Sequence, residues 1–350
     1  MSVPLNDPSR AINVVVTYDF SDSELADFHA VSPRLKVERF TGVVPDKVWA
    51  EAEILYTIKT FPLPEQAPRL RWIQLHSAGA DHAVKEPIFK AHDVEVTTTS
   101  GIHSVIISEY CLMMMTAFNF QLLQVLKYQA AAEWPAKRGD PSLSPAPTIA
   151  PYPLRDQTVG IVGYGSIGRE LARLCDALGM TVLAAKHDVM HPEEKLAYRQ
   201  EGTGDPSGEI PRRIYPMQAV ASMAKECDYL VVLTPLTPQT HHLINETVLA
   251  AMKKTAVLIN VSRGDVVDEA ALISALAAER IRGAGLDVFS EEPLPKSSPL
   301  WNLDNVILTP HNAGVTANYD TRAANVFIEN LHRYVENRPL LNTFNRERGY

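Results

Sequence analysis

The fold of this chain is decided by the stretch Thr158-Val159-Gly160-Ile161-Val162-Gly163-Tyr164-Gly165-Ser166-Ile167-Gly168. Its first half is a short β-branched run, which is typical of a buried parallel strand. Its second half is a turn with the spacing G-x-G-x-x-G. A helix is expected to follow, because apolar residues recur at helical spacing until Gly179 stops it, namely Ile167, Leu171, Leu174 and Leu178.

Each glycine of this turn has a physical role. Gly163 permits the tight turn, Gly165 lets a pyrophosphate approach the backbone, and Gly168 lets the helix pack closely on the strand. The N–H groups and the positive dipole end of the helix then hold the phosphates. A glycine-rich turn without a ligand has the same spacing, but the strand–turn–helix context favours a dinucleotide. The predicted cofactor contacts here are Gly163, Tyr164, Gly165, Ser166, Ile167 and Gly168.

The composition is that of an ordinary globular protein. The chain has 350 residues, enough for two domains, with 46% hydrophobic and 21% charged residues. A net charge of −8 argues against a general nucleic-acid or anionic-membrane binder. Residues 1–10 hold no apolar signal core, and the densest apolar stretch, Tyr110–Phe118, is about half the length of a membrane span.

The cysteines give no sign of a metal site or of disulfides. Cys111, Cys175 and Cys227 are spaced for neither a zinc site nor a disulfide framework, and all three lie in apolar segments. We therefore expect buried structural thiols, no metal, and a cytoplasmic location.

Residues 1–103 are predicted to form a first α/β unit with a parallel sheet flanked by helices. Two loops follow candidate strands, at 77–81 and at 99–103. Ligands bind beyond the carboxyl ends of parallel strands, so Ser77, Ala78 and Gly79 could offer backbone N–H groups to an anion. A plain tight turn is the alternative. The expected strands are Ile12–Tyr18, Lys36–Phe40, Ile54–Ile58, Leu70–Leu75 and Val94–Thr98.

The second half alternates strands and helices regularly, as in the doubly wound dinucleotide fold. One long helix over Ser104–Trp134 and a proline-rich surface loop over Arg138–Pro153 precede it. The polar segment Met190–Met217 is too long for an ordinary connection and is interpreted as an insertion. A last helix, Asn318–Glu336, should pack on the first domain. The expected strands are Thr158–Val162, Thr181–Ala185, Tyr229–Leu233, Ala256–Val261, Gly283–Val288 and Val306–Leu308.

The end of the second strand of this half bears on the choice of cofactor. An acidic residue there would bond the ribose 2′-hydroxyl of NAD. The position holds Lys186, which would attract the 2′-phosphate of NADP instead. NADP is therefore preferred, although Asp188 would favour NAD if the turn shifts by two residues.

Three segments at strand ends carry charged groups suited to one reaction: Leu258–Asp265, Gly283–Pro293 and Leu308–Gly314. Arg263 can bind a carboxylate through its guanidinium fork and polarise an adjacent carbonyl. His311 can give a proton to that carbonyl oxygen as a hydride arrives. Glu292 beside it would favour the imidazolium form. Taken singly, each residue also has an ordinary structural explanation.

The chain resembles the D-2-hydroxyacid dehydrogenase family over nearly its whole length. Five segments in order carry the resemblance: Thr158–Gly168, Thr234–Thr240, Ile259–Asp268, Gly283–Pro293 and Thr309–Gly314. The resemblance implies a Rossmann dinucleotide-binding domain, 104–314, and a flavodoxin-like substrate-binding domain, 1–103 plus 315–350, joined by two crossings. It implies hinges near Gly101–Glu109 and after His311. It also implies a homodimer that reduces a small 2-ketoacid, such as glyoxylate or hydroxypyruvate, with NADP or NAD.

The resemblance also assigns residue roles. It implies that Arg263, Glu292 and His311 are catalytic and that Ser77, Ala78 and Gly79 bind the substrate carboxylate with Arg263. The remaining implied cofactor contacts are Thr234, Val261, Ser262 and Asp287. A dinucleotide-sensing scaffold similar to the C-terminal binding protein corepressors is the alternative, although such chains tend to carry long disordered tails. Formate oxidation on the same fold is a third alternative. It is less favoured, because that reaction does not need the proton donor that the arginine, glutamate and histidine would supply.

Overall fold

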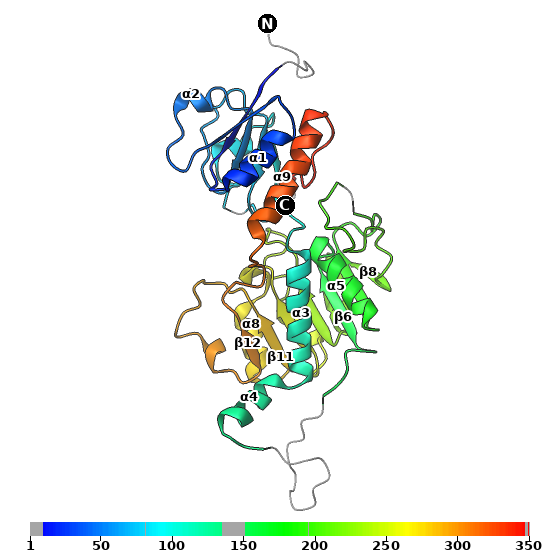
Figure 1. The fold of residues 1–350 in the computed structure, drawn as a ribbon. Helices are drawn as coiled ribbons and strands as arrows, with labels where there is room; N and C mark the ends of the chain where they lie inside the picture. Colours follow the sequence, from blue (N-terminus) through cyan, green and yellow to red (C-terminus); the bar gives the residue numbers. More distant parts are fainter. Residues whose placement is uncertain (1–9, 81, 135–150, 195, 347–348, 350) are drawn as a thin grey trace, which may run out of the picture. The chain divides into compact units, whose positions relative to one another are not determined.

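A computed structural model describes residues 10–80, 82–134, 151–194, 196–346 and 349 (Figure 1). Most of the predicted surface loop over 138–153 lies outside these residues, as does Asp81 of the loop at 77–81. The chain divides into two compact units. Unit 1 is Met1–Ile102, Lys195–Glu201 and Thr316–Tyr350, and unit 2 is His103–Glu194 and Gly202–Val315.

The division adds one feature to the domain organisation expected from the sequence. Residues 195–201, assigned there to the dinucleotide-binding domain, cluster with unit 1. The chain therefore passes between the units four times, rather than the two times expected.

Unit 1 is built on a five-stranded, all-parallel sheet in the order β2-β1-β3-β4-β5. This is the flavodoxin-like strand order. The elements are β1 (Ile12–Val16), α1 (Asp22–Ala30), β2 (Leu35–Arg39), α2 (Asp46–Trp49), β3 (Ile54–Thr57), β4 (Trp72–Leu75), a 3₁₀ helix (Pro87–Lys90), β5 (Glu95–Thr97) and α9 (Tyr319–Val335).

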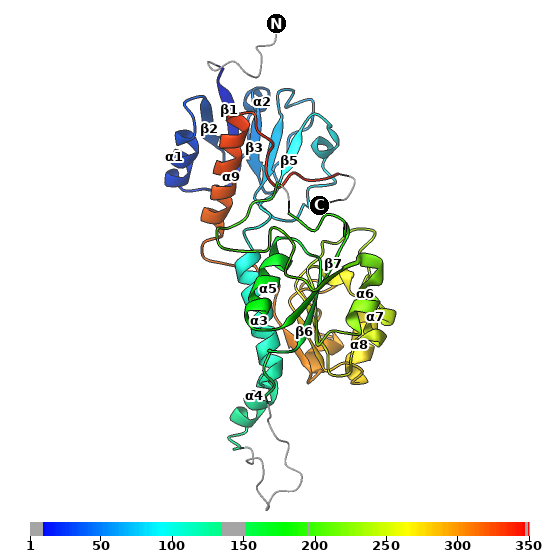
Figure 2. The same ribbon diagram turned by 90° about the vertical axis from the view of Figure 1, so that its right-hand side faces the viewer.

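Helix α9 packs beside α1 on this sheet, as the sequence predicts for the last helix (Figures 1 and 2). The ring of Phe327 meets Phe28 of α1 edge-on, with centroids 5.0 Å apart, and contacts Tyr56 and Trp72 of the sheet. Burial of these aromatic rings joins the C-terminal helix to the first hundred residues.

Unit 2 is built on a seven-stranded parallel sheet in the order β12-β11-β10-β9-β6-β7-β8. The strand order reverses at β6 and β9, which is the crevice where doubly wound folds bind dinucleotides. The elements are α3 (Ser104–Asn119), α4 (Leu122–Ala130), β6 (Thr158–Val162), α5 (Ser166–Ala177), β7 (Thr181–Lys186), β8 (Arg213–Pro216), α6 (Val220–Ala224), β9 (Tyr229–Val232), α7 (Glu246–Ala251), β10 (Val257–Asn260), α8 (Glu269–Ala277), β11 (Gly283–Leu286) and β12 (Val306–Leu308), with 3₁₀ turns at Met217–Ala219, Gly264–Val266 and Pro299–Asn302.

Helices cover both faces of this sheet (Figure 2). Side chains of α3 and α5 form one apolar core with Val159 and Ile161 of β6. Side chains of α6, α7 and α8 form another core with Val162 of the same strand. Because both faces of the sheet are buried, the sequences of these strands are continuous apolar runs.

The structure corrects two expectations about unit 2. The predicted long helix is two helices bent by 64°, α3 and α4, because Gln121 adopts a left-handed conformation with φ 51°. The predicted insertion contains a seventh strand, β8, which pairs with β7 and forms an edge of the sheet. Tyr215 is the one buried residue of β8, so the strand has little apolar pattern to reveal it.

No single helix among the described residues is long and apolar enough to cross a membrane. Taken together, the bent pair of α3 and α4 is long and apolar enough to do so by length and composition alone. Within the described part of the chain, no cluster of His, Cys, Asp and Glu is arranged to hold a metal ion.

Candidate active site

The glycine-rich turn has the geometry that its sequence predicts. Gly163 has φ +103°, and a β-carbon there would lie 2.8 Å from the backbone nitrogen of Thr234. A β-carbon on Gly168 would lie 2.5 Å from the carbonyl oxygen of Gly163, so the helix packs tightly on the strand end. A β-carbon on Gly165 would meet nothing within 4 Å. No side chain caps the first turn of α5, so its N–H groups can receive a phosphate.

Lys186 lies at the end of β7, and its ammonium group is turned toward the segment that follows this strand. It donates hydrogen bonds to the carbonyl oxygens of His191 and Pro192. Burial, followed by the nearby Arg169, lowers the pKa of Lys186. Asp188 bonds the ring Nδ1 of His191 at 2.8 Å, and the bond to His191 lowers the pKa of Asp188. Two of the three ammonium donors of Lys186 are therefore used within the chain.

The three segments that carry Arg263, Glu292 and His311 leave neighbouring strands at the same level. Asn260 of β10, Leu286 of β11 and Leu308 of β12 are partners in register. Because these strands are parallel, their carboxyl ends lie at one edge of the sheet. Within unit 2, the segments that carry Arg263, Glu292 and His311 therefore begin at the same edge of the sheet, as the sequence predicts.

The segment after β10 is anchored by Asn260. Its side chain donates to the carbonyl oxygen of Arg263 at 3.0 Å and accepts from the backbone and hydroxyl of Ser262. The guanidinium of Arg263 donates to the carbonyl of Ser262 at 2.7 Å. A β-carbon on Gly264 would lie 1.9 Å from the carbonyl carbon of Phe289. This close approach brings the Arg263 segment against the loop that carries Glu292.

Asp287 fixes the turn that carries His311. Its buried carboxylate accepts from the Thr309 hydroxyl at 2.6 Å and from the backbone of Asn312 and Ala313, each at 2.9 Å. The hydroxyls of Tyr110 of α3 and Thr309 lie 2.5 Å apart. Asp287, which the resemblance places beside the cofactor, thus also supports the backbone around His311.

His311 and Glu292 form a direct pair. The Nδ1 atom of His311 lies 2.7 Å from Oε2 of Glu292, and Oε1 of Glu292 accepts from the backbone of Phe289 at 3.0 Å. The side chain of His311 is 49% exposed, so its other ring nitrogen can reach a bound molecule. An imidazole oriented by a carboxylate on one nitrogen is the arrangement that acid–base catalysis needs.

The loop at 77–79 of unit 1 presents backbone donors. Within the described residues, the N–H groups of Ser77, Ala78 and Gly79 donate no hydrogen bond to the protein. The hydroxyl of Thr99 donates to the carbonyl of His76 at 2.7 Å, and its N–H donates to that of Ser77 at 3.1 Å. The two loops singled out in the sequence are therefore bonded to each other, and the first can bind an anion.

The remaining predicted cofactor residues lie at strand ends of unit 2. Thr234 is next to Gly163, and Val261 and Ser262 follow β10 directly. All three are buried.

Two residues that contact the glycine-rich turn, Arg169 and Asp205, are not predicted from the sequence. Their only signal is position: Arg169 follows the turn directly, and Asp205 lies between Gly204 and Pro206.

Comparisons with known proteins agree on one family. The sequence model of one protein family, described as 'D-isomer specific 2-hydroxyacid dehydrogenase, NAD binding domain', matches residues 112–313. The chain is 32% identical over 286 residues to a glyoxylate reductase of Korarchaeum cryptofilum, covering 80% of this chain and 79% of that one.

Two solved structures are also similar. A D-isomer specific 2-hydroxyacid dehydrogenase from Xanthobacter autotrophicus, in complex with NADPH and MES, has a TM-score of 0.76 and 27% identity and covers 98% of this chain and 100% of that one. An NADPH-dependent glyoxylate/hydroxypyruvate reductase from Sinorhizobium meliloti, in complex with NADP and sulfate, has a TM-score of 0.74 and 25% identity and covers 97% and 100%.

Proposed function

The chain belongs to the D-isomer specific 2-hydroxyacid dehydrogenase family, and from that premise we propose the reaction it catalyses and the residues that carry it. Membership makes it an NAD(P)-dependent enzyme that acts as a 2-ketoacid reductase. We propose that it reduces a small 2-ketoacid, such as glyoxylate or hydroxypyruvate, to the D-2-hydroxy acid. The reduced nicotinamide supplies the hydride, and the medium supplies the proton through the protein.

The pairing of His311 with Glu292, at the strand edge it shares with Arg263, carries this proposal. In it, His311 donates a proton to the carbonyl oxygen of the substrate, and Glu292 orients the imidazole through its contact with Nδ1. Arg263 binds the substrate carboxylate and polarises the adjacent carbonyl. The N–H groups of Ser77, Ala78 and Gly79 bind the same carboxylate.

The first test is the His311→Ala variant. General acid catalysis by a positioned side chain contributes about 10²–10⁴-fold, so ketoacid reduction should slow by that factor with NADPH binding retained. His332→Ala is the matched control, because His332 is an exposed residue of α9. A rate for His311→Ala within a few-fold of the wild-type rate contradicts the assigned role.

We further propose that NADPH is preferred over NADH. Lys186 lies at the end of β7 with one ammonium donor beyond the two used by His191 and Pro192, and its charge attracts a 2′-phosphate. Lys186→Ala should raise the KM for NADPH about tenfold and that for NADH about twofold or less. Lys225→Ala, an exposed lysine of unit 2, is the control. Equal effects on both cofactors would show that Lys186 only supports the insertion.

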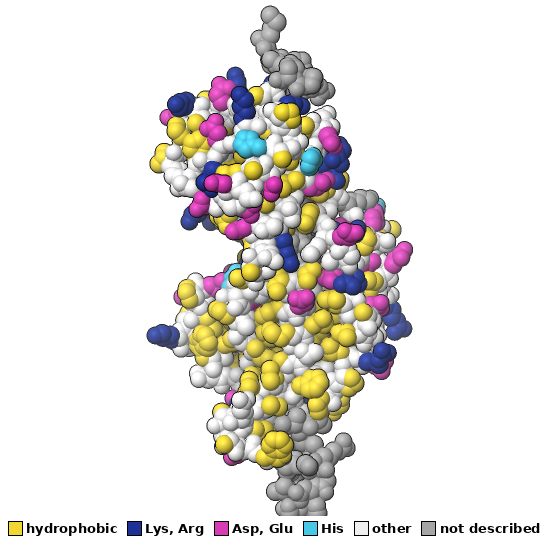
Figure 3. Space-filling model, in the orientation of Figure 1, with side chains coloured by type: hydrophobic (Ala, Val, Ile, Leu, Met, Phe, Trp, Pro, Cys, Tyr) yellow, Lys and Arg dark blue, Asp and Glu magenta, His cyan; other side chains and the backbone are white. Residues whose placement is uncertain are grey.

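A homodimer is the proposed assembly. Helix α4 has no buried residue, and its Leu122, Val125 and Leu126 are exposed large apolar side chains. Figure 3 shows hydrophobic side chains gathered on unit 2 over the region where α3 and α4 lie in Figure 1. Contiguous exposed apolar surface of this kind marks protein–protein contact sites. The cytoplasmic location stays a prediction.

A further inference from the structure

The segment between β7 and β8 contains most of the predicted insertion and is called the insertion below. Its two parts in unit 2, residues 187–194 and 202–212, lie against the glycine-rich turn and the start of α5. Glu194 donates its N–H to the carbonyl of Pro206 at 2.9 Å, so the two legs of the insertion are joined. The carbonyl of Pro192 accepts hydrogen bonds from both Arg169 and Lys186. The N–H of Gly204 donates to Glu170 of α5 at 2.7 Å.

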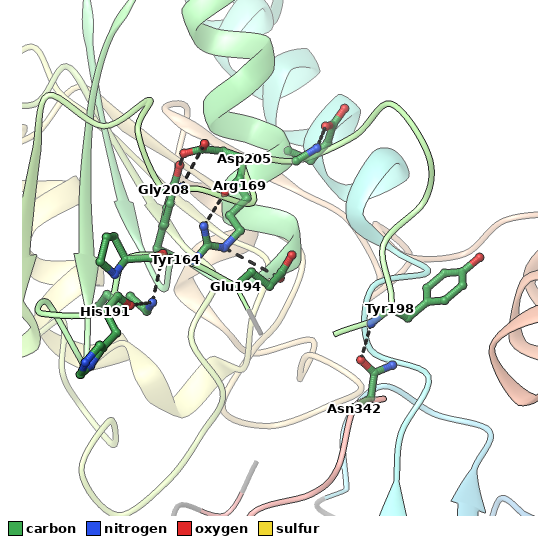
Figure 4. Close-up of polar contacts among 12 residues, drawn as sticks. Tyr164, Arg169, His191, Glu194, Tyr198, Asp205, Gly208 and Asn342 are labelled. Carbon is green, nitrogen blue, oxygen red and sulfur yellow. Dashed lines mark hydrogen bonds and ion pairs between the residues drawn. The ribbon is translucent and has the colours of Figure 1, made fainter. Parts of the chain in front are cut away.

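Asp205 is the polar centre of this contact (Figure 4). Its side chain is 94% buried, since only 6% of the residue is exposed. Oδ1 accepts from the backbone of Gly208 and Glu209, each at 3.2 Å, and Oδ2 accepts from that of Ile210 at 3.1 Å. These three backbone donors orient the carboxylate from within the insertion.

The carboxylate of Asp205 in turn binds the glycine-rich turn. The hydroxyl of Tyr164 donates to Oδ2 of Asp205 at 2.6 Å. Tyr164 lies between Gly163 and Gly165, so a restraint on its side chain restrains the backbone of both glycines. Burial, followed by the bond to Asp205, raises the pKa of Tyr164, and its hydroxyl remains a donor.

Arg169 strengthens the same contact from the first turns of α5. Its side chain is almost fully buried and donates to the main-chain carbonyl of Asp205. Its guanidinium carbon lies 4.7 Å from the centre of the Tyr164 ring, within cation–π range. The carboxylate of Glu194 in the insertion lies 3.8 Å from Nε of Arg169. Figure 4 shows Tyr164, Arg169 and Glu194 arranged around this point.

We propose that Asp205 is a positioning residue for the cofactor: through the hydroxyl of Tyr164 it holds the glycine-rich turn in the conformation that receives the dinucleotide phosphates. The inference rests on the binding of the cofactor at this turn, and it gives the insertion a role. Glycine gives a turn many conformations, so the free turn would lose conformational entropy on binding. Asp205 and Tyr164 reduce that loss before the cofactor arrives.

The test is direct binding of NADPH and of NADH, titrated by nicotinamide fluorescence without any ketoacid. Tyr164→Phe removes one hydroxyl and keeps the ring, and Asp205→Asn removes the charge. Each should raise the Kd about tenfold, because weakening or removing the Tyr164–Asp205 hydrogen bond leaves the turn disordered, and cofactor binding must then order it. The KM for the cofactor should rise more than kcat falls. Glu201→Gln is the matched control, because Glu201 is an exposed carboxylate in the same insertion.

The double variant Tyr164→Phe/Asp205→Asn should bind about as weakly as Asp205→Asn alone, because the hydroxyl removed by the first change acts only through the carboxylate removed by the second. Unchanged Kd values with a lowered melting temperature would overturn the proposal and leave a structural role only. If Asp205→Asn does not fold, Tyr164→Phe decides alone. Failure of the ketoacid assignment would appear separately, as wild-type protein that binds NADPH but does not oxidise it with any 2-ketoacid.

Discussion

Gly264 is the residue at which the segment that carries Arg263 meets the loop that carries Glu292. A β-carbon there would lie 1.9 Å from the carbonyl carbon and 2.1 Å from the carbonyl oxygen of Phe289. Backbone atoms cannot move aside as a flexible side chain does, so any larger residue must displace the loop that carries Glu292. The absence of a side chain at Gly264 therefore lets the Arg263 segment lie against the loop that carries Glu292.

Gly264→Ala should accordingly lower the free energy of unfolding by about 3 kcal/mol and reduce kcat, as overpacking against backbone does. Urea unfolding followed by circular dichroism measures the first effect. Gly42→Ala is the control, because a β-carbon there meets nothing within 4 Å; its effect should be about 1 kcal/mol or less. Equal stabilities of the two variants would contradict the close approach.

At this scale the sequence predicts the site only in part. Arg263, Glu292 and His311 can be found because each follows a strand whose apolar run is plain, and parallel strands end at a common edge. Asp205 has no such signal, because its partner Tyr164 is 41 residues away and the insertion between them lacks a regular pattern. The orientation of Lys186 depends on two carbonyl groups of the same insertion, which residue identity does not reveal.

Among the elements, strands are predicted better than helices. Strand β6 spans Thr158–Val162, as expected, because four of its five residues are buried and apolar cores lie on both faces of the strand. The break between α3 and α4 has no glycine or proline to announce it, since Phe120 and Gln121 lie there. Strand β8 is missed because it is a short edge strand that ends in a proline.

The packing of α3 and α5 also predicts the reactivity of the cysteines. Cys111 of α3 and Cys175 of α5 are fully buried in one core, and Cys227 is buried in the other. Burial raises the pKa of Cys175 and of Cys227 to about 12, and it raises the pKa of Cys111 as well. At pH 8, far below these values, all three groups are protonated thiols and poor nucleophiles.

A disulfide reagent added to the folded protein at pH 8 should therefore react slowly, whereas in denaturant it should titrate three thiols per chain. The control is glutathione under the same conditions, which sets the rate of an exposed thiol. Reaction of any cysteine at a comparable rate in the folded protein would contradict the burial of these helix faces.

For the whole molecule, the exposed apolar face of α4 predicts association. Leu126 is 48% exposed, and Leu126→Glu should convert the proposed dimer into monomers, because a buried interface cannot accommodate the unpaired carboxylate. Light scattering after gel filtration gives the mass of both proteins. Leu63→Glu is the matched control, since Leu63 is 47% exposed in unit 1. A monomeric wild-type protein would refute the proposed assembly.

The four passages of the chain between the units have an evolutionary consequence. Neither unit is one continuous stretch, and residues 195–201 of unit 1 are encoded inside the sequence of unit 2. A single genetic recombination cannot exchange one unit for that of a relative. A hybrid enzyme would have to inherit the short inner segment together with the partner sequence around Asn342, whose side chain accepts the N–H of Tyr198 at 2.9 Å.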